Sequence, residues 1–225
     1  MQLDEVIRGY GRTARGYDRR LRFWFGTVLR IEKHRERAVD LLGPLEGARV
    51  LDIGCGTGAN LPWLAPHVGE TGHIVGLDYS PAMLEQAHQR VESNGWTNVE
   101  LVRGDAVSLD AVQGSFDAIL STYCFGLLYD IEQAMIRAID RLKPNGRIAI
   151  LDFGRVRPKG PLGLLYPIYA EMLVRYGIDS REDLDEAVLR DRWDRGKALM
   201  RAKLENVAEE RFLFDLGLLV HGQKP

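Results

Sequence analysis

The chain has 225 residues, of which 45% are hydrophobic and 28% charged, with a formal net charge of −2. These values are ordinary for a soluble globular domain with its own core, and the sequence contains no repeat or low-complexity segment. Two cysteines, Cys55 and Cys124, are too few for a disulfide framework and lack metal-ligand spacing, so we expect a reducing compartment and no structural metal.

Charge is unevenly distributed along the chain. Residues 1–37 carry ten Lys or Arg and five acidic residues, a net charge of +5, which leaves −7 for the remainder. No signal peptide is evident, and no apolar run approaches the ~20 residues of a membrane span. The sequence therefore predicts a cytoplasmic protein. Its residues 8–37 are either a contact with an anionic membrane surface or a solvated helix face.

The predicted elements begin with a helical N-terminal cap over residues 1–44, where apolar residues are too dense for a polar arm. Strands and helices then alternate. The predicted strands are 49–53, 73–77, 99–103, 116–121 and 147–153, and the predicted helices between them are 60–67, 81–94 and 131–142. Ser80 followed by Pro81 predicts the start of the second of these helices, and Lys143-Pro144-Asn145-Gly146 predicts the end of the third.

This alternation of apolar strands with helices predicts an α/β fold, with a Rossmann-like, mainly parallel sheet of seven strands in one domain at 45–225. After Phe153 the alternation stops, and residues 155–202 are predicted to form a helical insertion or lid. Two apolar stretches at 207–214 and 216–221 predict a final hairpin, which makes the last strand antiparallel. Right-handed crossovers place the carboxyl ends of the parallel strands at one edge, where ligands bind.

The strongest local signal is the glycine loop that follows the first predicted strand, at Gly54, Gly56 and Gly58. Glycine is required where φ is positive or where a ligand touches the backbone. The helix that follows offers unpaired N–H groups at its N-terminus. The loop therefore predicts a site for a nucleotide-like ligand.

Two ligand classes fit this loop. Residues 54–59 can be read as the dinucleotide fingerprint G-x-G-x-x-G/A, although one such match is weak. Asp52 and the additional Gly58 favour S-adenosylmethionine (SAM), which has a sulfonium and an amino-acid tail. A carboxylate beside the loop can hold the ammonium group of that tail, directly or through water, but would be a poor neighbour for a pyrophosphate.

Two further acidic residues follow the next two predicted strands. Asp78 ends the second strand, where a carboxylate can accept both ribose hydroxyl protons. Asp105, in Gly104-Asp105-Ala106, follows the third strand and can accept from an adenine amino group while the Ala106 backbone reads the ring edge. Asp105 alone is equally typical of a turn, but it occurs in series with the glycine loop and Asp78.

These blocks resemble class I SAM-dependent methyltransferases. The resemblance spans about residues 45–153 and is carried by Asp52–Gly58, Asp78-Tyr79-Ser80, Gly104–Ala106 and Leu142–Gly146, with Asn145 where the family usually has glycine. With Tyr17-Asp18 and the continuation from Asp78 to Leu84, the chain is similar to ubiquinone/menaquinone C-methyltransferases and to related bacterial phospholipid N-methyltransferases. The resemblance implies that the head folds over SAM, with Tyr17 near the cofactor and Met83 near the adenine. The predicted cofactor-binding residues are Tyr17, Asp52, Gly54, Cys55, Gly56, Gly58, Asp78, Tyr79, Met83, Gly104, Asp105, Ala106 and Ser121.

The acceptor side is expected after the fourth predicted strand. Methyl transfer from a sulfonium is an in-line displacement that needs positioning rather than a nucleophilic side chain. Tyr123, Tyr17 and Asp152 are our candidate catalytic residues, in the sense of groups that position the acceptor. The Asn/Asp-Pro-Pro-aromatic block of nucleic-acid and protein amide methylases is absent, and the body is acidic, so nucleic acid is not an expected partner.

Phe23, Trp24 and Phe25 in the basic head favour a lipophilic acceptor, because such a segment can lie in a membrane interface and bind anionic vesicles in a salt-sensitive way. A phospholipid amine headgroup is slightly preferred over a lipid quinol. A soluble metabolite, an NAD(P)-dependent reductase and a non-catalytic nucleotide-binding module remain as alternatives.

Overall fold

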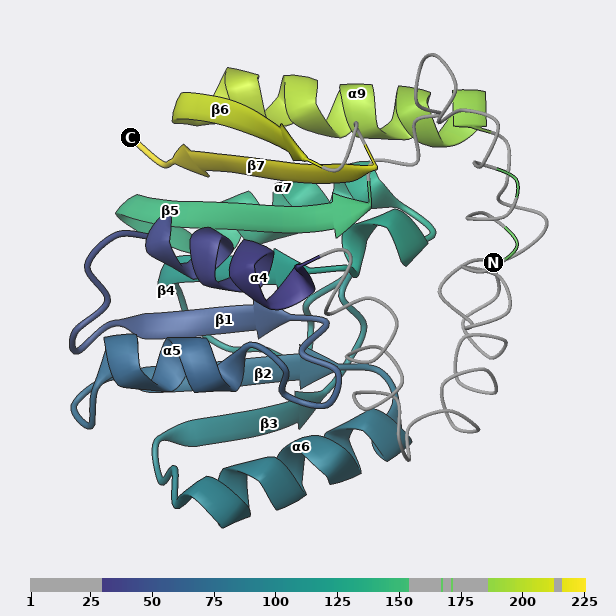
Figure 1. Ribbon diagram of the computed structural model, residues 1–225. Coiled ribbons are helices and arrows are strands. Elements are labelled where there is room, and N and C mark those ends of the chain that lie inside the picture. Colours follow the sequence, from purple (N-terminus) through teal and green to yellow (C-terminus); the bar gives the residue numbers. More distant parts are fainter. Residues whose placement is uncertain (1–29, 154–166, 168–170, 172–185, 213–215) are drawn as a thin grey trace.

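A computed structural model describes residues 30–153, 167, 171, 186–212 and 216–225 (Figure 1). Tyr17, the basic residues before Arg30 and the aromatic residues 23–25 lie outside the described residues. Most of the predicted insertion at 155–202 also lies outside them.

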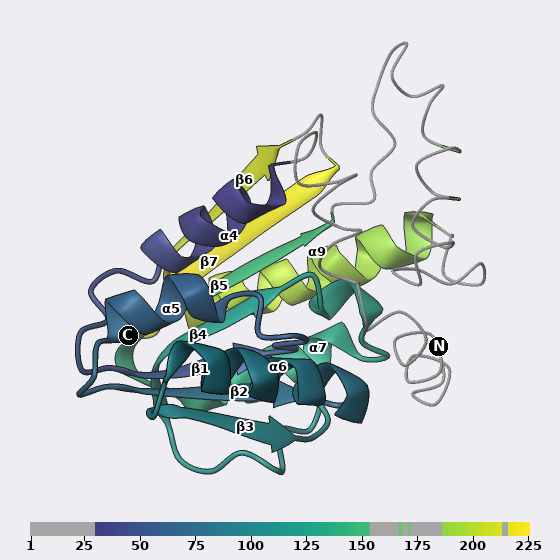
Figure 2. The ribbon, with the colours of Figure 1, turned by 60° about the horizontal axis from the view of Figure 1, so that its bottom comes forward.

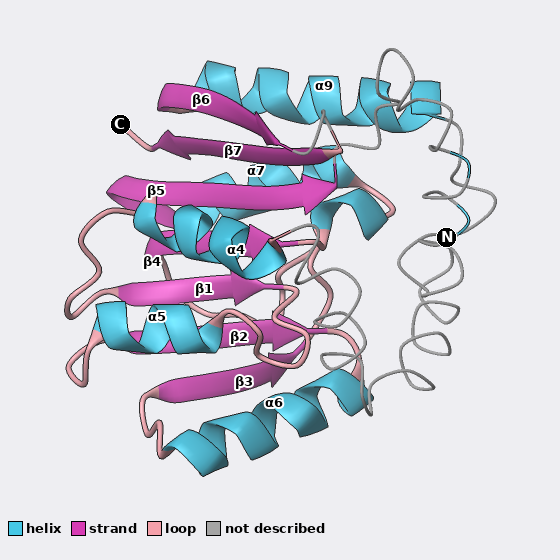
Figure 3. Ribbon diagram, in the orientation of Figure 1, coloured by secondary structure: helices cyan, strands magenta, loops and turns pink. Residues whose placement is uncertain are grey.

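The centre of the molecule is a seven-stranded sheet in the order β3-β2-β1-β4-β5-β7-β6 (Figure 3). Its strands are β1 (Arg49–Ile53), β2 (His73–Asp78), β3 (Val99–Arg103), β4 (Phe116–Thr122), β5 (Leu142–Phe153), β6 (Glu205–Phe212) and β7 (Gly217–Gln223). Neighbours from β3 to β5 pair in parallel, and β7 is antiparallel to both β5 and β6. The predicted Rossmann-like sheet with an antiparallel last strand is confirmed.

Helices cover both faces of this sheet (Figure 2). Helices α4 (Ile31–Asp40), α5 (Leu61–Val68) and α6 (Pro81–Asn94) lie on one face, and α7 (Ile131–Arg141) and α9 (Glu186–Lys203) on the other. A hydrophobic cluster fills the space on each side of the strands. No helix within the described ranges is long and apolar enough to cross a membrane.

The start of α6 follows the predicted local signals. Ser80 is the N-cap, and its Oγ accepts the N–H of Met83 at 3.4 Å, while Pro81 occupies the first helical position. The helix ends at Gly95, whose φ of 67° is left-handed. The N-terminal cap fixes the turn between β2 and α6, and Asp78, the last residue of β2, lies directly before that turn.

Strand β5 differs from the prediction, because it begins at Leu142 rather than at Arg147. The predicted stop at 143–146 is therefore part of the strand, and α7 ends one residue earlier than expected, at Arg141. The strand is extended by pairing with the C-terminal residues: Asn145 N–H donates to the Lys224 carbonyl at 3.0 Å, and Lys224 N–H donates to the Gly146 carbonyl at 2.8 Å. Asn145 takes φ 61°, which asparagine tolerates.

The order of the strands places the candidate site. Strand β1 lies near the centre of the sheet. The chain first adds β2 and then β3 on one side of β1, and it then adds β4 and β5 on the other side. The carboxyl ends of these five parallel strands meet at one edge, on the right in Figure 1. The gap between the loops that follow β1 and β4 is the topological switch point where open α/β sheets bind ligands.

Candidate functional site

The glycine loop after β1 is held against β2 by its backbone. The N–H groups of Gly54 and Cys55 both donate to the Leu77 carbonyl, at 2.8 and 2.9 Å. Gly54 has φ 70°, and a Cβ placed there would lie 2.4 Å from Cys124 Sγ. Gly56 has φ 55°, yet a Cβ there would meet no atom of the described residues within 4 Å. The loop is therefore closely packed at Gly54, and its backbone is open at Gly56, where a ligand can approach.

Asp78 lies next to this loop and binds its backbone. Its Oδ2 accepts the N–H of Gly56 at 2.8 Å, and its Oδ1 accepts the N–H of Ser80 at 2.8 Å. Burial raises the pKa of Asp78 above its ordinary value, and the backbone donors of Ser80, Gly56 and Tyr79 oppose that rise. A carboxylate oxygen can accept more than one hydrogen bond, so Asp78 can also accept from the hydroxyl groups of a ribose.

Asp52 is fully buried at the end of β1. Its Oδ1 accepts from Asn60 Nδ2 at 2.8 Å, and its Oδ2 has no hydrogen-bond partner among the described residues. Burial raises the pKa of Asp52 to about 7, against the lowering effects of the Asn60 hydrogen bond and the Arg35 charge. An unpartnered buried carboxylate oxygen is costly. The ammonium group of a SAM tail, or a water that bridges to it, would supply the missing partner.

Asp105 follows β3, next to Asp78 along the sheet edge. Its Oδ1 accepts the N–H of Val107 at 2.9 Å, and its Oδ2 accepts the hydroxyl of Tyr129 at 2.8 Å. Tyr129 is 53% exposed, and we did not identify it from the sequence. An adenine amino group at this carboxylate would share Oδ2 with the Tyr129 hydroxyl or replace it.

Several other residues that we predicted to bind the cofactor are buried or contact other parts of the protein. Met83 is buried in the first turn of α6, and Tyr79 lies under the Arg103 guanidinium, 5.7 Å from its ring centroid. Ser121 is fully buried, and its hydroxyl donates to the Ile53 carbonyl at 2.8 Å. That bond joins β4 to β1, so the Ser121 hydroxyl serves the sheet. Three further predicted residues line the loops at this edge without a polar side chain that a ligand could use: Gly58, Gly104 and Ala106.

Burial also decides the state of the two thiols. Cys55 lies within the glycine loop and Cys124 lies against it at Gly54, and burial raises the pKa of each thiol well above its ordinary value. Both side chains are therefore neutral and pack as small apolar groups.

On the acceptor side, Tyr123 follows β4 with φ 58°. A non-glycine residue in this region costs about 1–3 kcal/mol, and such strain clusters at functional sites. The Tyr123 ring lies 4.7 Å from the ring of Phe153, centroid to centroid, and 5.0 Å from the guanidinium carbon of Arg35. Tyr123 is therefore at the expected edge of the sheet, in an aromatic pair at the ends of β4 and β5.

Asp152 has a different environment from the one we predicted. Its two carboxylate oxygens accept the N–H groups of Phe153 and Gly126, both at 2.7 Å, and the residue is buried. Gly126 belongs to the short 3-10 helix η2 (Phe125–Leu127). Asp152 thus holds η2 against β5, and a role in positioning the acceptor stays a prediction.

Sequence reasoning missed a buried polar cluster beside Asp52. Asn60 is almost fully buried, and its Oδ1 accepts from Arg35 Nη1 at 2.6 Å and from Thr122 Oγ1 at 3.1 Å. The available signal was Asn60 itself, a polar residue at the start of an apolar helix. Nothing in the local sequence indicated its partner Arg35, which is 25 residues away.

The edge of the sheet thus combines an open glycine-loop backbone with three acidic side chains, a set that fits a nucleoside whose tail carries an ammonium group. Asp52 and the open backbone at Gly56 fit SAM, whereas a buried carboxylate beside the loop would repel a pyrophosphate.

The comparisons with known proteins agree with this assignment. Residues 50–146 match a family model described as a methyltransferase domain. It is 36% identical to the aklanonic acid methyltransferase DauC of Streptomyces sp. (strain C5) over 145 residues, 64% of this chain and 63% of that protein. It is 34% identical to the demethylmenaquinone methyltransferase of Thermus thermophilus over 152 residues, 68% of this chain and 66% of that protein.

A third relative is the 2-phytyl-1,4-naphtoquinone methyltransferase of Thermosynechococcus vestitus, 40% identical over 119 residues, 53% of this chain and 52% of that protein. The matched regions thus cover less than two thirds of the length of each of these relatives. A SAM-dependent methyltransferase from Aquifex aeolicus has the same fold, with a TM-score of 0.59 at 22% identity, over 85% of this chain and 89% of that one. The predicted resemblance to methyltransferases is confirmed.

We expect binding of the demethylated product, S-adenosylhomocysteine (SAH), to weaken as the pH falls below about 7, because Asp52 with its raised pKa then becomes protonated. A neutral carboxylic acid cannot attract the ammonium group of the tail, so the affinity should fall up to tenfold per pH unit. The Asp52→Asn variant should bind weakly at all pH values. Isothermal titration at a series of pH values measures both, and a wild-type affinity that stays constant from about pH 5.5 to about pH 8.5 would contradict this assignment.

Proposed function

We propose that this protein is a SAM-dependent methyltransferase whose acceptor is a flat, quinone-type aromatic ring. The observation that carries the cofactor assignment is the buried Asp52 Oδ2 without a partner among the described residues, beside a loop that is open at Gly56. The acceptor class is supported by relatives at 34% and 40% identity that are named for menaquinone and naphtoquinone substrates.

The side chains at the sheet edge would bind and orient the cofactor. Asp78 would accept from the ribose hydroxyls, Asp105 from the adenine amino group, and Asp52 would face the ammonium group of the tail. When bound, SAM supplies a methyl group already activated by the positive sulfur. The chain itself contributes position and exclusion of water, which suffices for an in-line displacement.

The acceptor would meet the aromatic pair of Tyr123 and Phe153. Offset packing on aromatic rings contributes about 0.5–1.5 kcal/mol per pair and holds a flat ring in one plane. A quinone is a poor nucleophile, so the reacting form is the reduced hydroquinone, whose hydroxyl groups enrich the ring carbons with electrons. The ring carbon gains a methyl group and releases one proton.

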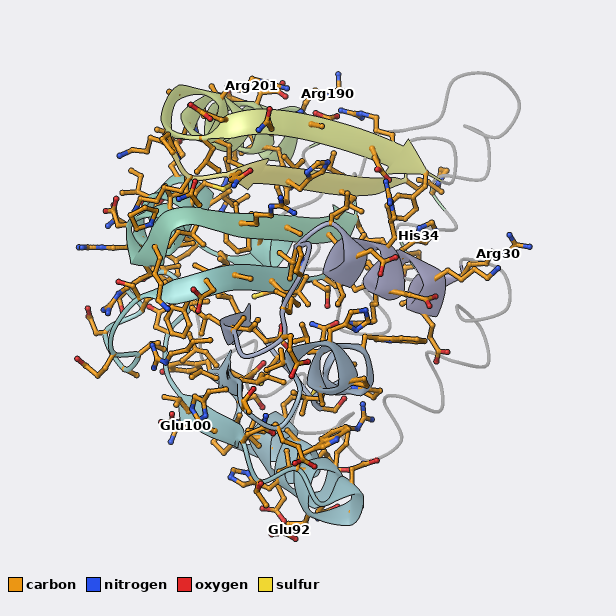
Figure 4. The ribbon with its side chains drawn as sticks, turned by 90° about the vertical axis from the view of Figure 1, so that its left-hand side faces the viewer. Arg30, His34, Glu92, Glu100, Arg190 and Arg201 are labelled. Atoms are coloured by element: carbon orange, nitrogen blue, oxygen red, sulfur yellow. The ribbon has the colours of Figure 1, made fainter. Side chains whose placement is uncertain are left out.

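The basic residues 8–37 remain a proposed contact with an anionic membrane surface, in a protein that we place in the cytoplasm. Figure 4 shows Arg30 extending away from the sheet at the start of α4. Arg37 forms an ion pair with Glu210 at 2.6 Å, and Arg35 donates to Asn60. Within the part of this segment that the structure describes, Arg30 is therefore better placed than Arg35 or Arg37 to meet a surface.

An acceptor assay tests this function. The purified protein is incubated with SAM and one of three acceptors: a reduced naphthoquinone without a ring methyl, the same compound oxidised, or phosphatidylethanolamine vesicles. We expect a methylated product, detected by mass spectrometry, in the reduced quinone arm alone. Product in the phosphatidylethanolamine arm alone would instead support the headgroup acceptor considered from the sequence, and product in no arm would contradict both.

A further inference from the structure

A polar cluster links helix α4 to the carboxylate at the end of β1. Arg35 Nη1 donates to Asn60 Oδ1 at 2.6 Å and also to Thr122 Oγ1. Thr122 Oγ1 donates to the same Asn60 oxygen at 3.1 Å, and Asn60 Nδ2 donates to Asp52 Oδ1 at 2.8 Å. The cluster thus joins four elements: α4, the end of β1, the start of α5 and the end of β4.

These hydrogen bonds leave one orientation for the Asn60 amide. Its oxygen accepts from two donors, which fills both lone pairs, so its NH2 group must point to Asp52. This in turn occupies Oδ1 of Asp52 and leaves Oδ2 as the oxygen without a partner among the described residues. Arg35 and Thr122, which donate to the Asn60 oxygen, therefore determine which oxygen of Asp52 is occupied.

We propose that Arg35 is a positioning residue for the cofactor: acting through Asn60, it fixes Asp52 with one oxygen available to the ammonium group of the SAM tail. This inference rests on the proposed function, because it assumes that Asp52 faces that group. Arg35 itself needs no contact with the cofactor.

The charges around Asp52 support this role. Asp78 on the neighbouring strand raises the pKa of Asp52, and the positive charge of Arg35 lowers it. The nearby thiols Cys55 and Cys124 are neutral, because burial raises the pKa of each. Among the described groups that act on Asp52, Arg35 is thus the cation that favours the ionised form of the carboxylate.

Helix α4, which carries Arg35, packs on β6 through His34, whose ring stacks on Phe212 with a centroid distance of 3.7 Å (Figure 4 labels His34). This packing fixes the position of α4, and the helix places Arg35 beside Asn60 and Thr122. Arg37 offers a matched control, because it lies on the same helix but its ion pair is exposed and remote from Asn60.

The experiment measures SAH affinity by isothermal titration from about pH 5.5 to about pH 8.5 for wild type and variants. Arg35→Gln and Arg35→Met remove the charge in two ways, since Gln keeps a polar end and Met keeps an apolar stem. We expect both to lower the affinity about tenfold at pH 7 and to move the pH midpoint of binding upward by about one unit. Arg35→Lys should return the midpoint toward the wild-type value, and Arg37→Gln should leave it unchanged.

A purely structural role predicts a different result. If Arg35 only packs the helix, its variants lower the thermal stability without moving the pH midpoint, and that outcome overturns the inference while the proposed function stands. A wild-type protein that binds SAH at no pH overturns the proposed function and the inference together. If one Arg35 variant fails to fold, the other decides, because either one tests the charge.

Discussion

Replacing Asp78 by asparagine should lower the affinity for SAM and SAH by about 100-fold. A carboxylate that accepts two ribose hydroxyl protons makes two charge-assisted hydrogen bonds, and each contributes about 1.5–3 kcal/mol. Asparagine has one acceptor oxygen, and that oxygen would already be needed by the N–H of Gly56 or Ser80. The variant therefore also loses one of the two backbone hydrogen bonds of this side chain, either to the glycine loop at Gly56 or to Ser80.

The measurement is isothermal titration of SAH against Asp78→Asn, with Asp140→Asn as the control. Asp140 is exposed on α7, so its substitution makes the same change in charge without touching the site. An Asp78→Asn protein that remains folded and binds SAH like the wild type would rule out the ribose role.

Alanine at Gly54 should mainly lower the stability of the fold, whereas alanine at Gly56 should mainly weaken ligand binding. At both positions a positive φ costs an L-residue about 1–2 kcal/mol. At Gly54 the new Cβ would also lie 2.4 Å from Cys124 Sγ, which adds an overpacking cost of about 1–3 kcal/mol. At Gly56 the methyl group meets no atom within 4 Å in the part of the chain that the structure describes, but it projects into the space that the cofactor would use.

We therefore expect Gly54→Ala to lower the free energy of unfolding by about 2–5 kcal/mol. Gly56→Ala should lower it by only about 1–2 kcal/mol and yet weaken SAH binding by more than tenfold. Denaturant unfolding and isothermal titration measure the two effects separately. Gly95→Ala is the control for backbone strain, because Gly95 has φ 67° and open surroundings at the far end of α6. Normal SAH affinity in Gly56→Ala would mean that the ligand lies elsewhere.

The parts of the fold with local signals were predictable. Ser80, Pro81 and Gly95 bound α6 within the sequence that forms it, and β1 with its glycine loop occupies one short stretch. The positions of Asp78 and Asp105 at the edge of the sheet were predictable, because the carboxyl ends of parallel strands lie at one edge.

The parts that depend on distant partners were not predictable. Strand β5 begins early because Leu142 pairs with Phe116 of β4 and because Asn145 and Gly146 bond to Lys224, and both partners are distant in the sequence. The Ser121 hydroxyl is taken by the Ile53 carbonyl, which follows from the register of β4 against β1. The bond between Tyr129 and Asp105 likewise joins side chains from two separate loops. Sequence spacing identifies which residues reach the edge, but the pairing among them arises only when the sheet is assembled.

The most direct test of the account is a titration of the purified wild-type protein with SAH and, in parallel, with NAD. The account predicts that SAH binds at one site per chain and that NAD gives no heat of binding, because Asp52 beside the loop suits the ammonium group of the SAH tail and repels a pyrophosphate. Binding of NAD without binding of SAH would contradict it and would restore the dinucleotide interpretation of residues 54–59.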